Sequence, residues 1–147
     1  MHKEFAPYIK WFGEWAGHGV SKTNIQVFTR LAIRPRLADQ VIEFQVESMD
    51  AQSSKLVHGV VALMGLGPDG QLRLAVLSTL HGAMDMPVTP EDPGALAIEG
   101  VSVEGNRVVV SLVEENDDLM LTSYWKKEVP GAEPVGFSNV KLQRVAG

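Results

Sequence analysis

Hydrophobic and polar residues alternate along much of the chain, as in β-strands that have one buried face. The clearest run, at about 40–49, places Ile42, Phe44 and Val46 on one face and acidic or amide side chains on the other. Another run, at about 55–65, is apolar on both faces. This pattern predicts strands at about 13–21, 24–34, 40–49, 55–65, 71–80, 95–103, 106–114, 118–127 and 135–145.

Short turn-forming segments separate most of these runs. The Gly-Pro-Asp-Gly segment at 67–70 is a strong turn, because proline presets φ and glycine accepts a positive φ. Short links also occur at 104–106 and 115–117. They favour antiparallel neighbours, since parallel strands need long crossovers, and a long meander closes to remove its edges. We therefore predict an all-β fold, an antiparallel up-and-down β-barrel of about 8–10 strands, with a two-sheet sandwich as the alternative.

Three segments interrupt the strand pattern. Residues 4–11 carry Phe5, Tyr8 and Trp11 at helical spacing, which predicts a short N-terminal helix or 3₁₀ turn that could cap one barrel end. Pro35 is expected to end the second run. Residues 81–94 hold three prolines and two glycines, so we predict an irregular loop there, either a functional loop or a surface crossover.

Composition narrows the possible classes of protein. The 147 residues suit one domain, 1–147, and the net charge of −5 shows no basic patch, so neither nucleic acid nor an anionic membrane is expected as a partner. No cysteine is present, which removes disulfides and thiolate chemistry and is compatible with a reducing compartment. The N-terminus lacks the pattern of a signal peptide, and no run approaches membrane-spanning length. We expect a cytoplasmic location.

The N-terminal motif Gly13-x-Trp15-x-Gly17-x-Gly19, the strand meander and a basic residue near the end of the chain resemble the calycin group. This group comprises lipocalins, fatty-acid-binding proteins and nitrobindin-like barrels, and the extended motif looks most like uncharacterised bacterial lipocalin-like families. The resemblance implies a barrel with an internal cavity, in which Arg144, or else Lys141, packs on the first-strand tryptophan.

Not every property of that group is expected here. The nitrobindin-like barrels bind haem through a histidine late in the chain, whereas this sequence has no histidine after His81. No histidines are paired at metal-ligand spacing, and no nucleophile elbow is present. We therefore expect neither a cofactor nor a metal.

Two polar residues are predicted inside the barrel because they share a face with apolar neighbours. His58 lies on the same predicted face as Leu56, and Ser78 lies on the same face as Leu80. A lone histidine in such a position is commonly a satisfied core residue, but it could also bind a ligand or act as a base.

Four further candidates lie near the irregular loop and on the penultimate strand. His81 opens the loop with Asp85 four residues on, a pair that could act as a general base at a cavity mouth. Met84 is an adaptable wall residue. Tyr124 and Trp125 point to opposite faces of their strand, so one faces inward, and Tyr124 is our candidate for an inner polar group.

These features favour one function and leave two others open. The first hypothesis is binding of a small, mostly apolar molecule inside the barrel, with His58, Ser78, His81, Met84, Tyr124 and Trp125 as the binding residues. The second is an enzyme of the isomerase or hydro-lyase type that uses His58 or His81 as general base. The third is an oligomerisation module with a filled core, since the two-sided apolar run could support a homodimer.

Overall fold

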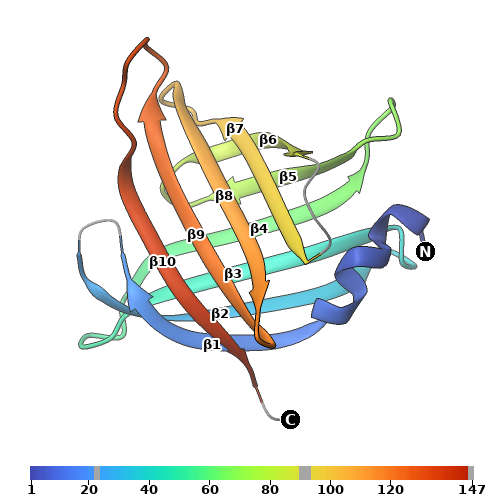
Figure 1. Cartoon of the computed structure of the whole chain (residues 1–147), viewed down its shortest axis with the longest axis horizontal. Helices are drawn as coiled ribbons and strands as arrows, with labels where there is room; N and C mark the ends of the chain where they lie inside the picture. Colours follow the sequence, from blue (N-terminus) through green and yellow to red (C-terminus); the bar gives the residue numbers. More distant parts are fainter. Residues whose placement is uncertain (22–23, 90–93, 146–147) are drawn as a thin grey trace.

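The computed structural model shows a closed barrel of ten antiparallel strands, all formed by described residues (Figure 1). The structure describes residues 1–21, 24–89 and 94–145. Consecutive strands are neighbours, and β1 pairs with β10 to close the barrel, which confirms the predicted up-and-down topology. The elements are η1 (Lys3–Trp11), β1 (Gly13–Val20), β2 (Gln26–Arg36), β3 (Val41–Asp50), β4 (Leu56–Leu66), β5 (Leu72–Ser78), β6 (Gly82–Thr89), β7 (Ala95–Val101), β8 (Asn106–Glu115), β9 (Asp118–Lys127) and β10 (Val135–Arg144).

The alternating pattern decides which side chains fill the barrel. On β3, Ile42 and Phe44 are buried, whereas Glu43 lies on the outer face and pairs with Arg36. The hairpin at the β8–β9 turn forms as predicted, because Asn116 and Asp117 both adopt the positive φ that a two-residue turn requires. Within the described residues, no helix has the length and apolar character needed to cross a membrane.

The prediction that Pro35 ends the second strand is wrong. The β2–β3 ladder continues through Pro35, which pairs with Ile42, to Arg36. The β1–β2 ladder begins only at Gly13 and Ile33, so Pro35 lies beyond the start of β1. At that position β2 is an edge, where a proline without an N–H is tolerated.

The prediction of an irregular loop at 81–94 is also wrong for most of its length. Residues 82–89 form β6, in which Met84 and Met86 point inward. Pro87 pairs with Arg73 of β5, and the β6–β7 ladder includes Val88 and Thr89 within the described residues. Proline and glycine residues concealed the alternation of β6 in the sequence. A proline is tolerated in this strand because the regular β6–β7 ladder covers only Val88 and Thr89 among the described residues. Residues 90–93 lie outside the described residues.

Two leucines predicted inside lie on the surface. Leu56 is 53% exposed because a register shift at the β3–β4 ladder makes Val57 an extra residue and turns Leu56 outward. Leu80 is 42% exposed because β5 ends at Ser78 and the chain turns there. Apart from these ends, β4 and β5 alternate as predicted.

The helix η1 lies at the end of the barrel where β1 begins (Figure 1). Its aromatic residues Phe5 and Trp11 are fully buried, and Trp15 of β1 is buried beside them. The Arg144 guanidinium lies 4.2 Å from the Trp15 ring centroid and donates to the carbonyls of Phe12 and Lys10 at 2.8 and 2.7 Å. This contact confirms the arginine–tryptophan pair that the resemblance implied and closes this end.

Glycines permit the close approach of β1 and β10 that closes the barrel. A Cβ atom at Gly17 would lie 1.8 Å from the Lys141 carbonyl oxygen, and one at Gly19 would lie 2.4 Å from that of Asn139. Both obstacles are backbone atoms, so a side chain at either position would force the strands apart.

Candidate ligand-binding cavity

An internal cavity of about 120 Å³ lies inside the barrel and reaches toward the end opposite η1. Its walls come from β2 to β10, so it lies between opposite sides of the barrel rather than on one strand. Most of its lining is apolar: Leu31, Phe44, Val46, Val60, Ala62, Leu74, Val76, Met84, Met86, Leu96, Ile98, Val108, Val110, Leu112, Leu121 and Val140. The protein therefore contains a hollow, and the hypothesis of a completely filled core is wrong.

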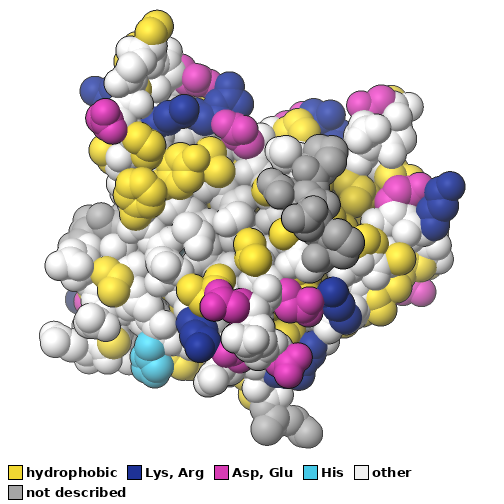
Figure 2. Space-filling view, in the orientation of Figure 1, with side chains coloured by type: hydrophobic (Ala, Val, Ile, Leu, Met, Phe, Trp, Pro, Cys, Tyr) yellow, Lys and Arg dark blue, Asp and Glu magenta, His cyan; other side chains and the backbone are white. Residues whose placement is uncertain are grey.

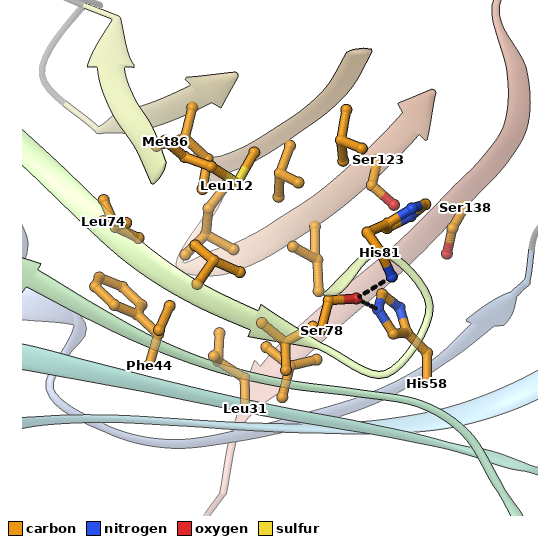
Figure 3. Close-up of a pocket in the computed structure, with 18 of the residues that line it drawn as sticks. Leu31, Phe44, His58, Leu74, Ser78, His81, Met86, Leu112, Ser123 and Ser138 are labelled. Carbon is orange, nitrogen blue, oxygen red and sulfur yellow. Dashed lines mark hydrogen bonds between the residues drawn. The ribbon is translucent and has the colours of Figure 1, made fainter. Parts of the chain in front are cut away.

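The polar lining residues gather at one end of the cavity, opposite its apolar end (Figure 3). They lie near the end of β3, the start of β4, the end of β5, the turn after β5, the end of β9 and the start of β10, which all meet at the barrel end opposite η1. These residues are Ser48, His58, Ser78, His81, Ser123 and Ser138. The lining, which consists entirely of described residues, contains no Lys, Arg, Asp or Glu.

His58 and Ser78 form the best-defined polar contact of this end. His58 Nε2 lies 2.8 Å from Ser78 Oγ, and the same oxygen accepts the backbone N–H groups of Leu80 and His81 at 3.2 and 3.1 Å. With two accepted N–H groups and the contact with His58 Nε2, Ser78 Oγ already makes three hydrogen bonds.

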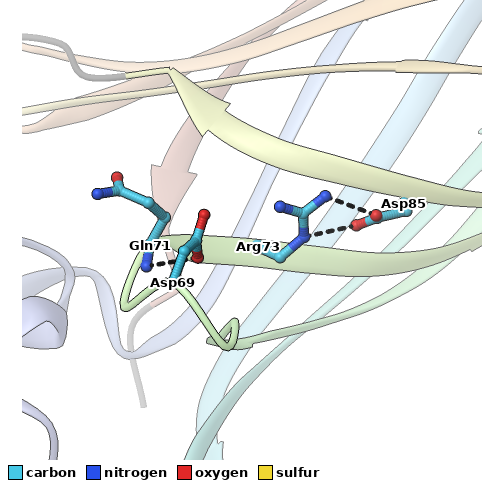
Figure 4. Close-up of polar contacts among 4 residues, drawn as sticks. All are labelled: Asp69, Gln71, Arg73 and Asp85. Carbon is cyan, nitrogen blue, oxygen red and sulfur yellow. Dashed lines mark hydrogen bonds and ion pairs between the residues drawn. The ribbon is translucent and has the colours of Figure 1, made fainter.

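His81 is buried beside this pair but has no contact with Asp85. The His58 and His81 rings meet edge to face with centroids 6.0 Å apart. Asp85 lies on the outer face, where Arg73 Nε and Nη2 donate to its oxygens at 3.1 and 2.6 Å (Figure 4). The hydrogen bond from Arg73 lowers the pKa of Asp85 below its usual range. The hypothesis of a His81–Asp85 base pair is wrong, because alternation along β6 turns Asp85 outward.

The remaining predicted residues divide between the two faces of the barrel. Met84 is buried and lines the cavity. Trp125 shares the inner face of β9 with Ser123 and packs partly buried against the core, without lining the cavity. Tyr124 lies on the outer face, where its ring meets that of Phe137, which is 56% exposed. Hydrophobic side chains gather on this outer face among charged residues (Figure 2). Tyr124 as an inner polar group is therefore wrong.

Three cavity-lining serines were missed by the sequence analysis. Ser48 forms a 2.7 Å hydrogen bond with the fully buried Thr29. Ser123 and Ser138 are partners in the β9–β10 register. The signal was present, since Ser123 lies two residues after the inward Leu121 and Ser138 lies two before the inward Val140. No group of three or more His, Cys, Asp or Glu residues that could hold a metal ion occurs in the described part of the chain.

No protein-family model and no curated protein sequence matches this chain. Solved structures do resemble it. Rv2717c from M. tuberculosis aligns with a TM-score of 0.76 and 11% sequence identity over 99% of each chain. The S-type phycobiliprotein lyase CPES from Guillardia theta aligns with a TM-score of 0.64 and 13% identity over 100% of this chain and 94% of its own. The fold is a calycin-like, lipocalin-type barrel. At such low identity these likenesses establish the fold alone.

Proposed function

We propose that the barrel binds one small, mostly apolar molecule in its cavity. The observation that carries this proposal is the division of the cavity into an apolar part and a polar end (Figure 3). Binding sites for small molecules are commonly apolar with a few polar groups that orient the ligand. Burial of the ligand's apolar surface would supply about 25 cal/mol per Å², from which the cost of ordering the ligand is subtracted.

The volume of the cavity limits the size of this molecule. The cavity measures about 120 Å³. An engineered protein cavity of roughly 150 Å³ binds benzene, whereas pockets for drug-sized ligands measure about 300 Å³ or more. A single ring or a short hydrocarbon chain therefore matches the space, and a long acyl chain or a haem exceeds it.

Native mass spectrometry of protein purified from its own host tests this proposal. We expect a complex with one small molecule that departs when the protein is denatured, and the released molecule should be of single-ring size. A denatured control separates bound molecules from covalent modifications. Protein that remains ligand-free and also fails to bind single-ring probes at millimolar concentration would contradict the proposal.

An enzyme on the same barrel is the second candidate, because both imidazoles lie in the cavity wall. A histidine base would remove a proton from carbon of the bound molecule, and reprotonation in D₂O would leave deuterium there. We expect such an enzyme to raise the mass of the released molecule, and H58Q or H81Q to abolish that gain. Binding without any deuterium incorporation would favour a pure binding protein.

The homodimer expected from the sequence stays a prediction. Val61 and Leu63 of β4 and Leu77 of β5 are exposed apolar side chains on the outer face. Val61 and Leu77 are register partners, so they form a continuous apolar strip. Sedimentation velocity of the wild type and of L77E checks this expectation: a dimer using this strip would dissociate in the variant, and a monomeric wild type would contradict it.

A further inference from the structure

Two adjacent serines form one side of the polar end of the cavity. Ser123 of β9 and Ser138 of β10 are register partners, and both side chains line the cavity. Directly paired residues on one face of an antiparallel sheet have Cβ atoms roughly 5 Å apart, so their hydroxyls are available to one ligand atom. Resting on the proposed binding function, we propose that this serine pair selects a neutral, single-ring ligand that carries a hydroxyl group, such as a phenol.

The serine pair is better placed for this role than the Ser78 hydroxyl. Ser78 Oγ already accepts two backbone N–H groups and bonds to His58 Nε2, so it makes three hydrogen bonds within the protein. A ligand could bond to Ser78 only by breaking one of these contacts. Ser78 therefore holds the turn after β5 and orients His58, and ligand recognition by hydroxyl groups falls to other residues.

Ser123 and Ser138 retain complementary hydrogen-bonding capacity. Ser123 Oγ has no hydrogen-bond partner among the described residues, so it can both donate and accept. Ser138 Oγ donates to the Val20 carbonyl at 3.2 Å and keeps its lone pairs as acceptors. A ligand hydroxyl can accept from Ser123 and donate to Ser138 at once. A hydrocarbon of the same size satisfies neither serine.

The absence of lysine, arginine, aspartate and glutamate from the cavity wall, as far as its residues are described, argues for a neutral ligand. Apart from the histidines His58 and His81, the described residues that line the cavity include no side chain that could balance a carboxylate. Burying an ionised carboxylate without a counter-charge is costly, whereas a hydroxyl group needs only hydrogen-bond partners. The wall therefore discriminates against benzoate and in favour of phenol at equal ring size.

Titrations of the purified protein with phenol, toluene and benzoate, followed by NMR chemical shifts, test the inference. In the wild type, we expect phenol to bind more tightly than toluene and benzoate to bind weakest. In S123A, phenol affinity should fall about five-fold, the effect of one lost hydrogen bond, while toluene affinity is unchanged or rises. S111A is the matched control, because Ser111 lies between the inward Val110 and Leu112 on β8 and does not line the cavity; it should change neither affinity.

The outcomes separate this inference from the proposed function. Toluene binding combined with phenol binding that S123A does not weaken would overturn the serine-pair inference and leave cavity binding intact. The same applies if benzoate binds more tightly than phenol. If none of the three probes binds the wild type, both the inference and the proposed function are wrong. The S138A variant provides a second check, with an expected loss of phenol affinity of similar size.

Discussion

The two ends of the barrel use the same strands and the same alternation of inward and outward residues, yet one end is solid and the other is hollow. At the η1 end the inward and capping side chains include Phe5, Trp11 and Trp15, which are all buried. At the opposite end, inward positions carry serines, histidines and valines around the cavity. Side-chain size, rather than hydrophobic pattern, therefore decides where a ten-strand barrel leaves space for a ligand.

Polar groups also play different roles at the two ends. At the solid end, Arg144 makes structural contacts, since it stacks on Trp15 and donates to two carbonyls. At the hollow end, Ser123 has hydrogen-bonding capacity to spare within the described residues. The solid end should accordingly control stability, and the hollow end should control binding.

The largest expected loss of stability comes from a substitution where β1 pairs with β10. G17A should lower the free energy of unfolding by about 4 kcal/mol or more, because its Cβ would overlap the Lys141 backbone. Urea denaturation measures this loss. G105A is the control, since Gly105 has a positive φ, which Gly17 lacks, but open space around it, and it should cost about 1 kcal/mol. Equal effects of the two variants would show that the close approach of β1 and β10 is not limiting.

The next largest loss of stability is expected at the η1 end of the barrel, which Arg144 helps to close. R144A removes two charge-assisted hydrogen bonds and the stacking on Trp15, which should lower the unfolding free energy by about 2 kcal/mol. K141A loses a mostly exposed ion pair with Asp118 and should change stability by less than about 1 kcal/mol. Thermal or urea unfolding checks both variants. Toluene affinity of R144A should equal that of the wild type, and a large loss would break the division of roles between the ends.

Filling the cavity should weaken ligand binding and change the stability of the protein little. V110W places a large ring in the cavity that Val110 lines, so toluene binding should weaken at least ten-fold. We expect the unfolding free energy to change less than in R144A, because the ring enters existing space. Calorimetric titration and urea unfolding measure the two quantities. Undiminished toluene binding in V110W would mean that the ligand binds elsewhere.

The smallest effect on stability is expected from the Arg73–Asp85 ion pair on the outer face of the barrel. The pKa of Asp85 is lowered by Arg73, so the pair contributes stability above the unfolded-state pKa of Asp85, and this contribution is lost as the pH falls through the lower folded-state pKa. In R73Q, the Asp85 carboxyl should titrate nearer its ordinary range, as NMR of the side chain would show. Phenol and toluene affinities should not change. An unchanged Asp85 titration would contradict the assigned cause.

Alternation predicted the closed barrel and most strands, and the resemblance to calycin barrels implied that Arg144, or else Lys141, packs on Trp15. The errors arise where local pairing overrides the pattern. The extra residue Val57 turned Leu56 outward, and proline concealed β6, which pairs mainly with β5. The inward residue of the Tyr124–Trp125 pair depended on the register of β9, which periodicity alone does not fix. Sequence placed His58 and Ser78 correctly on the inner face, but their mutual hydrogen bond follows from strand pairing.

Methyl NMR of the protein titrated with toluene shows directly whether the cavity binds a ligand. We expect saturable shifts for the methyl groups of Val76, Val110 and Leu112, which line the cavity. The methyl groups of Leu119 and Leu142 are fully buried outside the cavity lining and should stay unchanged. Shifts of equal size in both sets, or no saturable shifts at all, would contradict the claim that one end of this barrel is a ligand-binding cavity.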